Sequence, residues 1–140
     1  MKVKLLLTGK TSERYLREGI DLYTARIGHY VPFELVETAE GQWMKHIRPG
    51  DCVVLLDERG QSFSSVDWAR NLEQKAAHLP KDLVFVIGGP YGFPQEMYDR
   101  SDELLSLSRM TMSHQLVRLV FLEQLYRAMT ILKGEHYHHE

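Results

Sequence analysis

Short continuous runs of apolar residues alternate along this chain with longer stretches in which apolar residues recur at every third or fourth position. The continuous runs predict β-strands that are buried on both faces, and the recurring positions predict amphipathic helices. The expected strands are Val3–Thr8, the shorter and partly alternating Phe33–Glu37, Cys52–Leu56, Leu83–Ile87 and a weak one at Leu104–Leu107. The expected helices cover residues 13–28, 41–47, 66–78, 95–100 and 114–132.

Polar residues mark where two of these helices begin. Thr11 or Ser12 is in position to cap helix 13–28, and Ser64 or Ser65 is in position to cap helix 66–78, which Pro80 is expected to end. The apolar positions of the first helix, which should pack against the rest of the chain, are Tyr15, Leu16, Ile20, Leu22, Tyr23 and Ile27. The aromatic residues expected in the core rather than in base stacking are Tyr15, Tyr23, Phe33 and Trp43.

Strands that alternate with helices indicate a parallel sheet covered by helices on both faces, which is the α/β fold class. The 140 residues have the length of one domain, and they contain neither an internal repeat nor a long linker. A composition of 44% hydrophobic and 26% charged residues is typical of a folded soluble protein. Because no apolar run approaches the roughly 18–20 residues of a membrane span, we expect a cytoplasmic protein.

The charge distribution and the cysteine content exclude few functions. The formal net charge of −2 divides into +3 for residues 1–30, −6 for residues 31–108 and +1 for residues 109–140. A modest basic face built from the two ends could meet phosphates, although solvated helix surfaces explain the same counts. The single cysteine, Cys52, lies in an apolar run and is expected to be a buried core residue, which disfavours a redox or zinc role.

Ligands of open parallel sheets bind beyond the carboxyl ends of the strands, so the loops after Leu56, Ile87 and Leu107 are the candidate sites. The second of these loops is Gly88-Gly89-Pro90-Tyr91-Gly92-Phe93, whose glycines permit positive φ angles and close approach of the backbone to a ligand. Its spacing does not match the Gly-x-Gly-x-x-Gly fingerprint of dinucleotide-binding proteins. A flavodoxin-like or dinucleotide-binding protein and a tight turn without a ligand both stay open as alternatives.

The loop after Leu107 runs from Ser108 to His114 and leads into a helix. It is rich in hydroxyl groups and backbone donors, and the start of a helix favours anions and electron-rich groups. In the alternative interpretation, Ser113 only caps the helix and His114 is a first-turn residue without chemistry.

Two further groups of polar residues have simpler interpretations. Asp57-Glu58 could be an acid pair, but neighbouring carboxylates in a loop are usually solvated. The C-terminal tail holds His136, His138 and His139. Neighbouring histidines point apart in an extended chain and no cysteine completes a tetrahedral set, so we expect no metal site.

Five groups of residues occur in the order typical of one protein family. They are residues 5–10 (Leu-Leu-Leu-Thr-Gly-Lys), 56–61 (Leu-Asp-Glu-Arg-Gly-Gln) with Ser64-Ser65, 85–92 (Phe-Val-Ile-Gly-Gly-Pro-Tyr-Gly), 105–118 (Leu-Ser-Leu-Ser-Arg-Met-Thr-Met-Ser-His-Gln-Leu-Val-Arg), and 123–128 with 134–138. On these motifs the chain resembles, nearly end to end, the bacterial ribosomal RNA large-subunit methyltransferases of RlmH type. That family is a small member of the SPOUT superfamily of trefoil-knotted, S-adenosylmethionine-dependent methyltransferases.

The resemblance implies one methyltransferase domain over residues 1–140, with a deep C-terminal trefoil knot and the cofactor site within about residues 84–140. It implies methyl transfer from S-adenosylmethionine to N3 of a pseudouridine in helix 69 of 23S rRNA in assembled ribosomes, without a metal ion. The residues expected to bind the cofactor are Leu56, Gly88, Gly89, Ser108, Arg109, Met110, Thr111, Met112 and Ser113.

Uracil N3 carries a proton and is a poor nucleophile while it does, so the enzyme must help to remove that proton. The residues expected to remove the proton and to hold the substrate are His114, Arg118, Tyr137 and His138. Arg118 is expected to bind phosphate or to stabilise the anion that develops on the base. In the alternative interpretation, it is a helix-surface charge paired with an acid such as Glu123.

Members of the family are homodimers in which the tail and N-terminal part of one subunit complete the site of the other, and we expect the same here. The apolar side of the last helix would then be partly interface, and its residues are Leu116, Val117, Val120, Phe121, Leu125 and Met129. Core burial within one chain is the alternative.

The chain departs from the family pattern at two points. His139 stands where the family usually has Lys or Arg, so a cationic contact to RNA at this position depends on protonation of the imidazole. The segment between the second strand and Trp43 is shorter than usual. Methylation of another RNA, and a non-catalytic ribosome-binding module that keeps the cofactor pocket, stay open as alternative functions.

Overall fold

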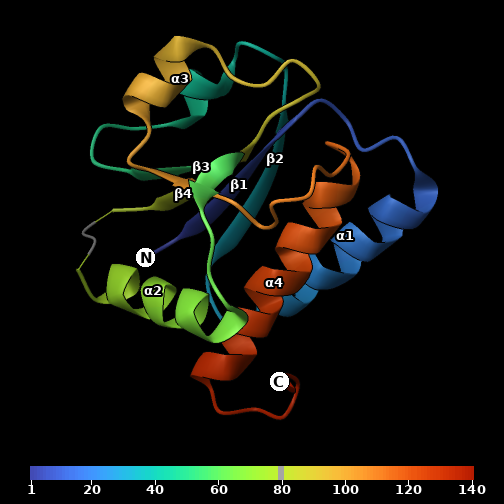
Figure 1. Cartoon of the computed structure of the whole chain (residues 1–140), viewed down its shortest axis with the longest axis vertical. Helices are drawn as coiled ribbons and strands as arrows, with labels where there is room; N and C mark the ends of the chain where they lie inside the picture. Colours follow the sequence, from blue (N-terminus) through green and yellow to red (C-terminus); the bar gives the residue numbers. More distant parts are fainter. Residues whose placement is uncertain (79–80) are drawn as a thin grey trace.

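A computed structural model describes residues 1–78 and 81–140 and contains one parallel sheet between two layers of helices (Figure 1). The expected helix stop at Pro80 lies outside the described residues. The strands are β1 (Val3–Thr8), β2 (Phe33–Thr38), β3 (Cys52–Gln61), β4 (Leu83–Ile87) and β5 (Glu103–Leu105). They are arranged in the order β2-β1-β4-β3-β5, and each neighbouring pair is parallel. The α/β prediction is therefore confirmed.

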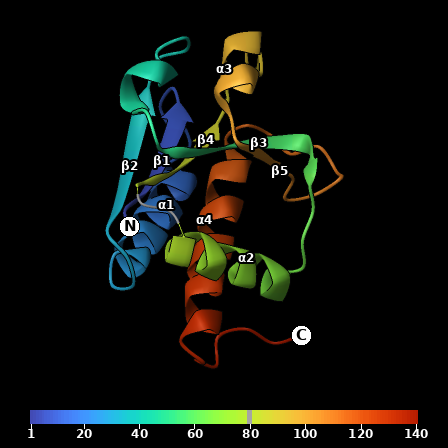
Figure 2. The ribbon, with the colours of Figure 1, turned by 90° about the vertical axis from the view of Figure 1, so that its left-hand side faces the viewer.

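Helices cover both faces of this sheet, as the continuous apolar strands require. The helical elements are α1 (Arg14–Ile27), the 3-10 turn η1 (Trp43–His46), α2 (Ser65–His78), α3 (Gln95–Arg100) and α4 (Leu116–Leu132). α1, α2 and α4 lie on one face, where Leu5 and Leu7 contribute to the larger core cluster; η1 and α3 lie on the other, where Leu6 packs (Figure 2). Among the described residues, no helix is both long and apolar enough to cross a membrane.

The start of α1 is not capped as expected. Its N-cap residue is Glu13, and no side chain caps it. Thr11 instead receives a hydrogen bond on its hydroxyl from Arg118, and the Ser12 amide donates to Gln115, so the Thr11 and Ser12 prediction is wrong because both residues are held by the α4 segment. The expected cap of α2 is confirmed, because the Asp67 amide donates to the Ser64 hydroxyl at 3.1 Å.

Two of the expected packing positions on α1 face outward. Tyr15 is 64% exposed and Leu22 is 48% exposed, so the core prediction is wrong for both. Trp43 is buried and donates its indole N–H to the Thr8 hydroxyl at 2.8 Å, as expected of a core aromatic. Cys52 is a buried free cysteine, and burial raises the pKa of its thiol to about 11.

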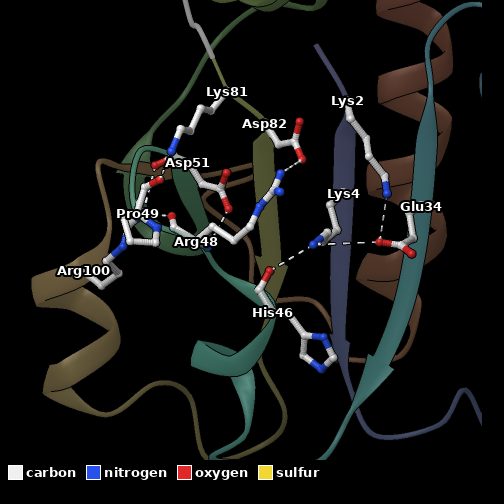
Figure 3. A network of polar contacts seen from close by, with 10 residues as sticks. All are labelled: Lys2, Lys4, Glu34, His46, Arg48, Pro49, Asp51, Lys81, Asp82 and Arg100. Atoms are coloured by element: carbon white, nitrogen blue, oxygen red, sulfur yellow. Dashed lines mark hydrogen bonds and ion pairs between the residues drawn. The ribbon is translucent and has the colours of Figure 1, made fainter.

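Polar contacts tie the amino-terminal edge of the sheet together (Figure 3). The turn before β3 is held through its carbonyl groups, because Lys81 donates to Pro49 O at 2.8 Å and Arg100 donates to the carbonyls of Arg48 and Asp51. The candidate loops after Leu56, Ile87 and Leu107 lie at the opposite, carboxyl-terminal edge of the sheet.

Candidate functional site

One cleft of about 550 Å³ lies at the carboxyl ends of β4 and β5 and beside Leu56–Arg59 of β3. β3 does not end at Leu56 as expected but continues to Gln61. The residues expected to bind a cofactor that line it are Leu56, Gly88, Gly89, Ser108, Met110, Thr111, Met112 and Ser113. Arg109 is exposed and is not among the lining residues. His114 and Val117 line the same cleft at the start of α4. The parallel sheet therefore brings together residues as far apart in the chain as Leu56 and His114.

In the glycine loop after β4, one glycine is required by its backbone conformation and two by close packing. Gly92 has a φ of +71° and donates its N–H to Gly89 O at 3.2 Å, which closes the turn. Gly88 and Gly89 do not have positive φ angles. A Cβ atom at Gly88 would lie 3.2 Å from the Phe93 ring, and one at Gly89 would lie 3.3 Å from a methyl carbon of Thr8. Tight packing against the protein therefore favours glycine at both positions.

Side-chain hydroxyls shape the loop from Ser108 to His114. The Ser108 hydroxyl accepts the Met110 N–H at 2.9 Å, and the Ser113 hydroxyl accepts the Leu116 N–H at 3.0 Å. Ser113 thus satisfies the free amide of the first residue of α4 and also lines the cleft. The N-cap residue itself is Gln115, and no side chain caps it, so the interpretation of Ser113 as the N-cap is wrong. The helix begins at Leu116 rather than at His114.

A polar cluster at the mouth of the cleft was not recognised from the sequence. Asp57 accepts hydrogen bonds from Arg59 through its backbone N–H, Nε and Nη2, and it also accepts a short one from the Tyr98 hydroxyl. The Asp57 side chain is only 9% exposed, so the expectation of a solvated carboxylate is wrong for this residue. Hydrogen bonds from Arg59, with a further one from Tyr98, outweigh partial burial and lower the pKa of Asp57 to about 2.

Glu58 lies across the mouth from this cluster. The Thr111 hydroxyl donates to Glu58 Oε2 at 2.9 Å, so the residues that follow Leu56 contact the loop after β5. The only sequence signal for either arrangement was the motif at residues 56–61 itself.

Arg118 is completely buried beneath the cleft instead of facing a substrate or the solvent. Its guanidinium donates to Thr8 O at 2.6 Å, to Gly9 O at 3.0 Å and to the Thr11 hydroxyl at 2.9 Å, while burial lowers its pKa. The interpretation as a surface charge paired with Glu123 is wrong, because Arg127 forms that ion pair. Arg118 thus fixes the end of β1, which lies next to the glycine loop.

The C-terminal tail leaves α4 at the end opposite to the cleft (Figure 1), and Tyr137 and His138 fold back against the middle of this helix. His114 lies just before the first residue of α4, whereas Glu123, which Tyr137 contacts, lies seven positions beyond Leu116, or about 10 Å along the helix. The Tyr137 hydroxyl donates to Glu123 at 3.3 Å, and Arg127 Nη1 lies 3.1 Å from His138 Nδ1. Burial is the main cause of a raised Tyr137 pKa. The four residues expected to act on the substrate are therefore not brought together within one chain.

No group of three or more His, Cys, Asp or Glu side chains is arranged to hold a metal ion within residues 1–78 and 81–140.

Comparison with known proteins gives a family match over almost the whole chain. The family described as "Predicted SPOUT methyltransferase" matches residues 1–138. A protein of Parabacteroides distasonis named ribosomal RNA large subunit methyltransferase H is 46% identical, and the alignment covers 100% of each chain. A protein of the same name from Bacteroides fragilis is 44% identical, again over 100% of each chain. The alignments span 157 positions against 140 residues here, so these relatives contain residues that this chain lacks.

Solved structures share the fold at much lower sequence identity. A probable methylase family protein from Haemophilus influenzae Rd KW20 superposes with a TM-score of 0.56 at 12% identity, covering 99% of this chain and 70% of the other. A structure described as giving insights into 2-OH methylation of C/U34 on tRNA has a TM-score of 0.51 at 16% identity, with 96% and 98% of the chains covered. These matches support the fold only.

Proposed function

Since the chain belongs to the SPOUT methyltransferase family, we propose that it methylates large-subunit ribosomal RNA in the cytoplasm, with S-adenosylmethionine as the methyl donor. The proposed acceptor is N3 of a pseudouridine in helix 69 of 23S rRNA within assembled ribosomes. The whole chain would act as one domain, with the knot and most cofactor contacts in about residues 84–140.

The observation that carries this proposal is the cleft itself. Its volume of about 550 Å³ lies within the roughly 300–1,000 Å³ typical of cofactor sites. Leu56, Met110 and Met112 provide apolar side chains suited to an adenine ring, and Gly88, Gly89 and Ser108 line the same cleft. When bound, S-adenosylmethionine supplies the electrophilic methyl group. The residues present therefore fit such a cofactor.

His114 is the proposed proton acceptor for the base N3–H. Its imidazole lines the cleft, and an imidazole nitrogen with a free lone pair can accept a proton. Removal of this proton would leave N3 with the available lone pair that methylation requires. S-adenosylmethionine held by the cleft would supply the methyl group and would leave as S-adenosylhomocysteine.

Arg118 acts in this proposal as a positioning residue. It is buried and its donors are directed at Thr8, Gly9 and Thr11, so it does not reach the base. The Thr8 hydroxyl in turn donates to Ile87 O at 3.0 Å, immediately before the glycine loop. Arg118 therefore fixes the end of β1, which supports the glycine loop, and it does not bind phosphate.

The distance between the cleft and the tail supports a composite site in a homodimer. We infer that Tyr137 and His138 of one protomer complete the cleft of its partner. Exposed apolar side chains on the α1–α4 side, namely Tyr15, Leu22 and Leu116, would be covered in this dimer. Phe121 and Leu125 are fully buried in the single chain and belong to its core rather than to the interface.

Transfer of labelled methyl from S-adenosylmethionine to ribosomes that lack the helix 69 modification tests the function. Free 23S rRNA serves as the parallel substrate, and mass spectrometry identifies the methylated nucleoside. We expect N3-methylpseudouridine on ribosomes. Label on a different nucleotide would refute the acceptor, and cofactor binding without transfer would favour a non-catalytic ribosome-binding module.

Mixed dimers test the shared site. His114→Ala and His138→Ala protomers are each expected to be inactive alone, because each damages both composite sites. When equal amounts are refolded together, about half of the dimers contain one of each, and one site of each such dimer keeps both residues. Recovery of roughly a quarter of wild-type activity is expected. One variant is labelled with 15N so that mass spectrometry can distinguish mixed dimers from the two homodimers. No recovery, with mixed dimers demonstrated in this way, would refute the shared site.

A further inference from the structure

The motif at residues 56–61 places three polar residues in the cleft in addition to Leu56. Strand β3 pairs regularly with β5 up to Leu56, loses register, and pairs again at Gln61. Gly60 makes this detour possible, since a Cβ atom there would lie 2.5 Å from the carbonyl carbon of Leu104. The irregularity carries Asp57, Glu58 and Arg59 across the mouth of the cleft, where all three are lining residues.

Arg59 is held in one orientation although it is 70% exposed. Its Nε lies 3.2 Å from Asp57 Oδ1, its Nη2 lies 3.1 Å from Asp57 Oδ2 and 2.7 Å from the Tyr98 hydroxyl, and its guanidinium stacks 5.2 Å from the Tyr98 ring centre. Nη1 has no hydrogen-bond partner among the residues that the structure describes. A fixed guanidinium with a free donor edge loses little further entropy when it binds an oxyanion.

The surrounding charges indicate which ligand this arrangement suits. Residues 31–108 carry a net charge of −6, and Asp57 and Glu58 are both at the mouth. Arg59 neutralises Asp57, and Glu58 is turned to the Thr111 hydroxyl on the other wall. Without Arg59, two carboxylates would face any polyanion that approached the cleft.

We propose that Arg59 binds a backbone phosphate of the RNA next to the nucleotide that enters the cleft, and that Asp57 and Tyr98 position it for this contact. The proposal rests on the proposed RNA substrate. Only Leu56 of the motif at residues 56–61 was expected from the sequence to be a site residue, and this proposal adds substrate binding by Arg59.

The test compares Arg59→Gln with wild type and with Arg70→Gln. Arg70 is a matched control, because it is 72% exposed and pairs with Asp67 on α2. For Arg59→Gln we expect the KM for ribosomes to rise roughly three- to tenfold and the slope of log binding constant against log salt to fall by about one. The kcat should stay near the wild-type value, whereas the melting temperature should fall because Asp57 loses the guanidinium that stabilises its charge. Arg70→Gln should resemble wild type throughout.

The double variant Asp57→Asn/Arg59→Gln separates phosphate binding from simple neutralisation of Asp57. If Arg59 contacts phosphate, the double variant keeps the weak ribosome binding and the reduced salt slope. Restored binding in the double variant, or unchanged binding in Arg59→Gln, overturns the proposal. Weaker binding of S-adenosylhomocysteine with an unchanged salt slope would assign the guanidinium to the cofactor carboxylate and also overturn it.

Ribosome binding is measured by co-sedimentation as well as through methylation. If the wild type binds ribosomes but transfers no methyl group, the proposed reaction fails, and the salt slope still decides the role of Arg59.

Discussion

Replacement of Arg118 by methionine distinguishes a positioning role from a direct role on the substrate. Arg118→Met keeps much of the aliphatic volume but removes the guanidinium that donates to Thr8 O, Gly9 O and the Thr11 hydroxyl. These acceptors would lose their cationic partner inside the protein, since Arg118 has no exposed surface. A buried acceptor without a partner is destabilising, whereas an active-site charge can often be removed with a gain in stability.

The expected loss follows from these three contacts. Hydrogen bonds to a charged donor contribute about 1.5–3 kcal/mol each, but the variant no longer has to bury a cation, which offsets several kcal/mol. We therefore expect Arg118→Met to lower the free energy of unfolding by about 3 kcal/mol. For a chain of this length, that corresponds to a fall in melting temperature of about 10 °C.

Urea denaturation measures the stability, and calorimetry of S-adenosylhomocysteine measures the cofactor site. Because Thr8 contacts the residues beside the glycine loop, we expect cofactor affinity to fall several-fold as well. Arg17→Met is the matched control: Arg17 donates to Thr11 O and Ser12 O from an exposed position, so less than about 1 kcal/mol should be lost. Wild-type stability and cofactor affinity in Arg118→Met, combined with lost methyl transfer, would refute the positioning role.

Three further predictions concern stability and reactivity. Gly60→Ala should lose about 1–3 kcal/mol, because its Cβ would clash with the backbone of Leu104. Gly28→Ala, at a φ of −59°, should change stability by less than about 1 kcal/mol, and equal effects in urea titrations would contradict this reasoning. The pKa of Asp57 is about 2 when folded and about 3.9 when unfolded, so the stability that this carboxylate provides is complete above about pH 4 and is lost as pH falls through 2. The stability difference between wild type and Asp57→Asn should therefore shrink over this range, and a pH-independent difference would argue against the ion pair. The Cys52 thiol is buried and has a pKa of about 11, so it should react with a disulfide reagent at pH 8 only at the rate of unfolding, and fast labelling of the native protein would show otherwise.

The sequence by itself determined the fold class, the extents of most elements and the location of the cleft. Strands buried on both faces must be continuously apolar, so β1 and β4 have the predicted bounds, Val3–Thr8 and Leu83–Ile87. Parallel strands bring their carboxyl ends to one edge, so the loops after Leu56, Ile87 and Leu107 could be selected before their contacts were known. The family motifs added the chemistry expected of those loops.

Only the tertiary structure decided which polar residues face the cleft. A charged residue on a helix is expected at the surface, yet Arg118 is buried because the free carbonyls at the end of β1 need donors. The detour at Gly60 places Arg59 over the cleft through a backbone contact with Leu104 that no local pattern encodes. The tail folds back so that Tyr137 contacts Glu123 in the middle of α4, which keeps it away from His114 at the start of the helix. Periodicity reports which side of an element is apolar, whereas these positions depend on partners from distant parts of the chain.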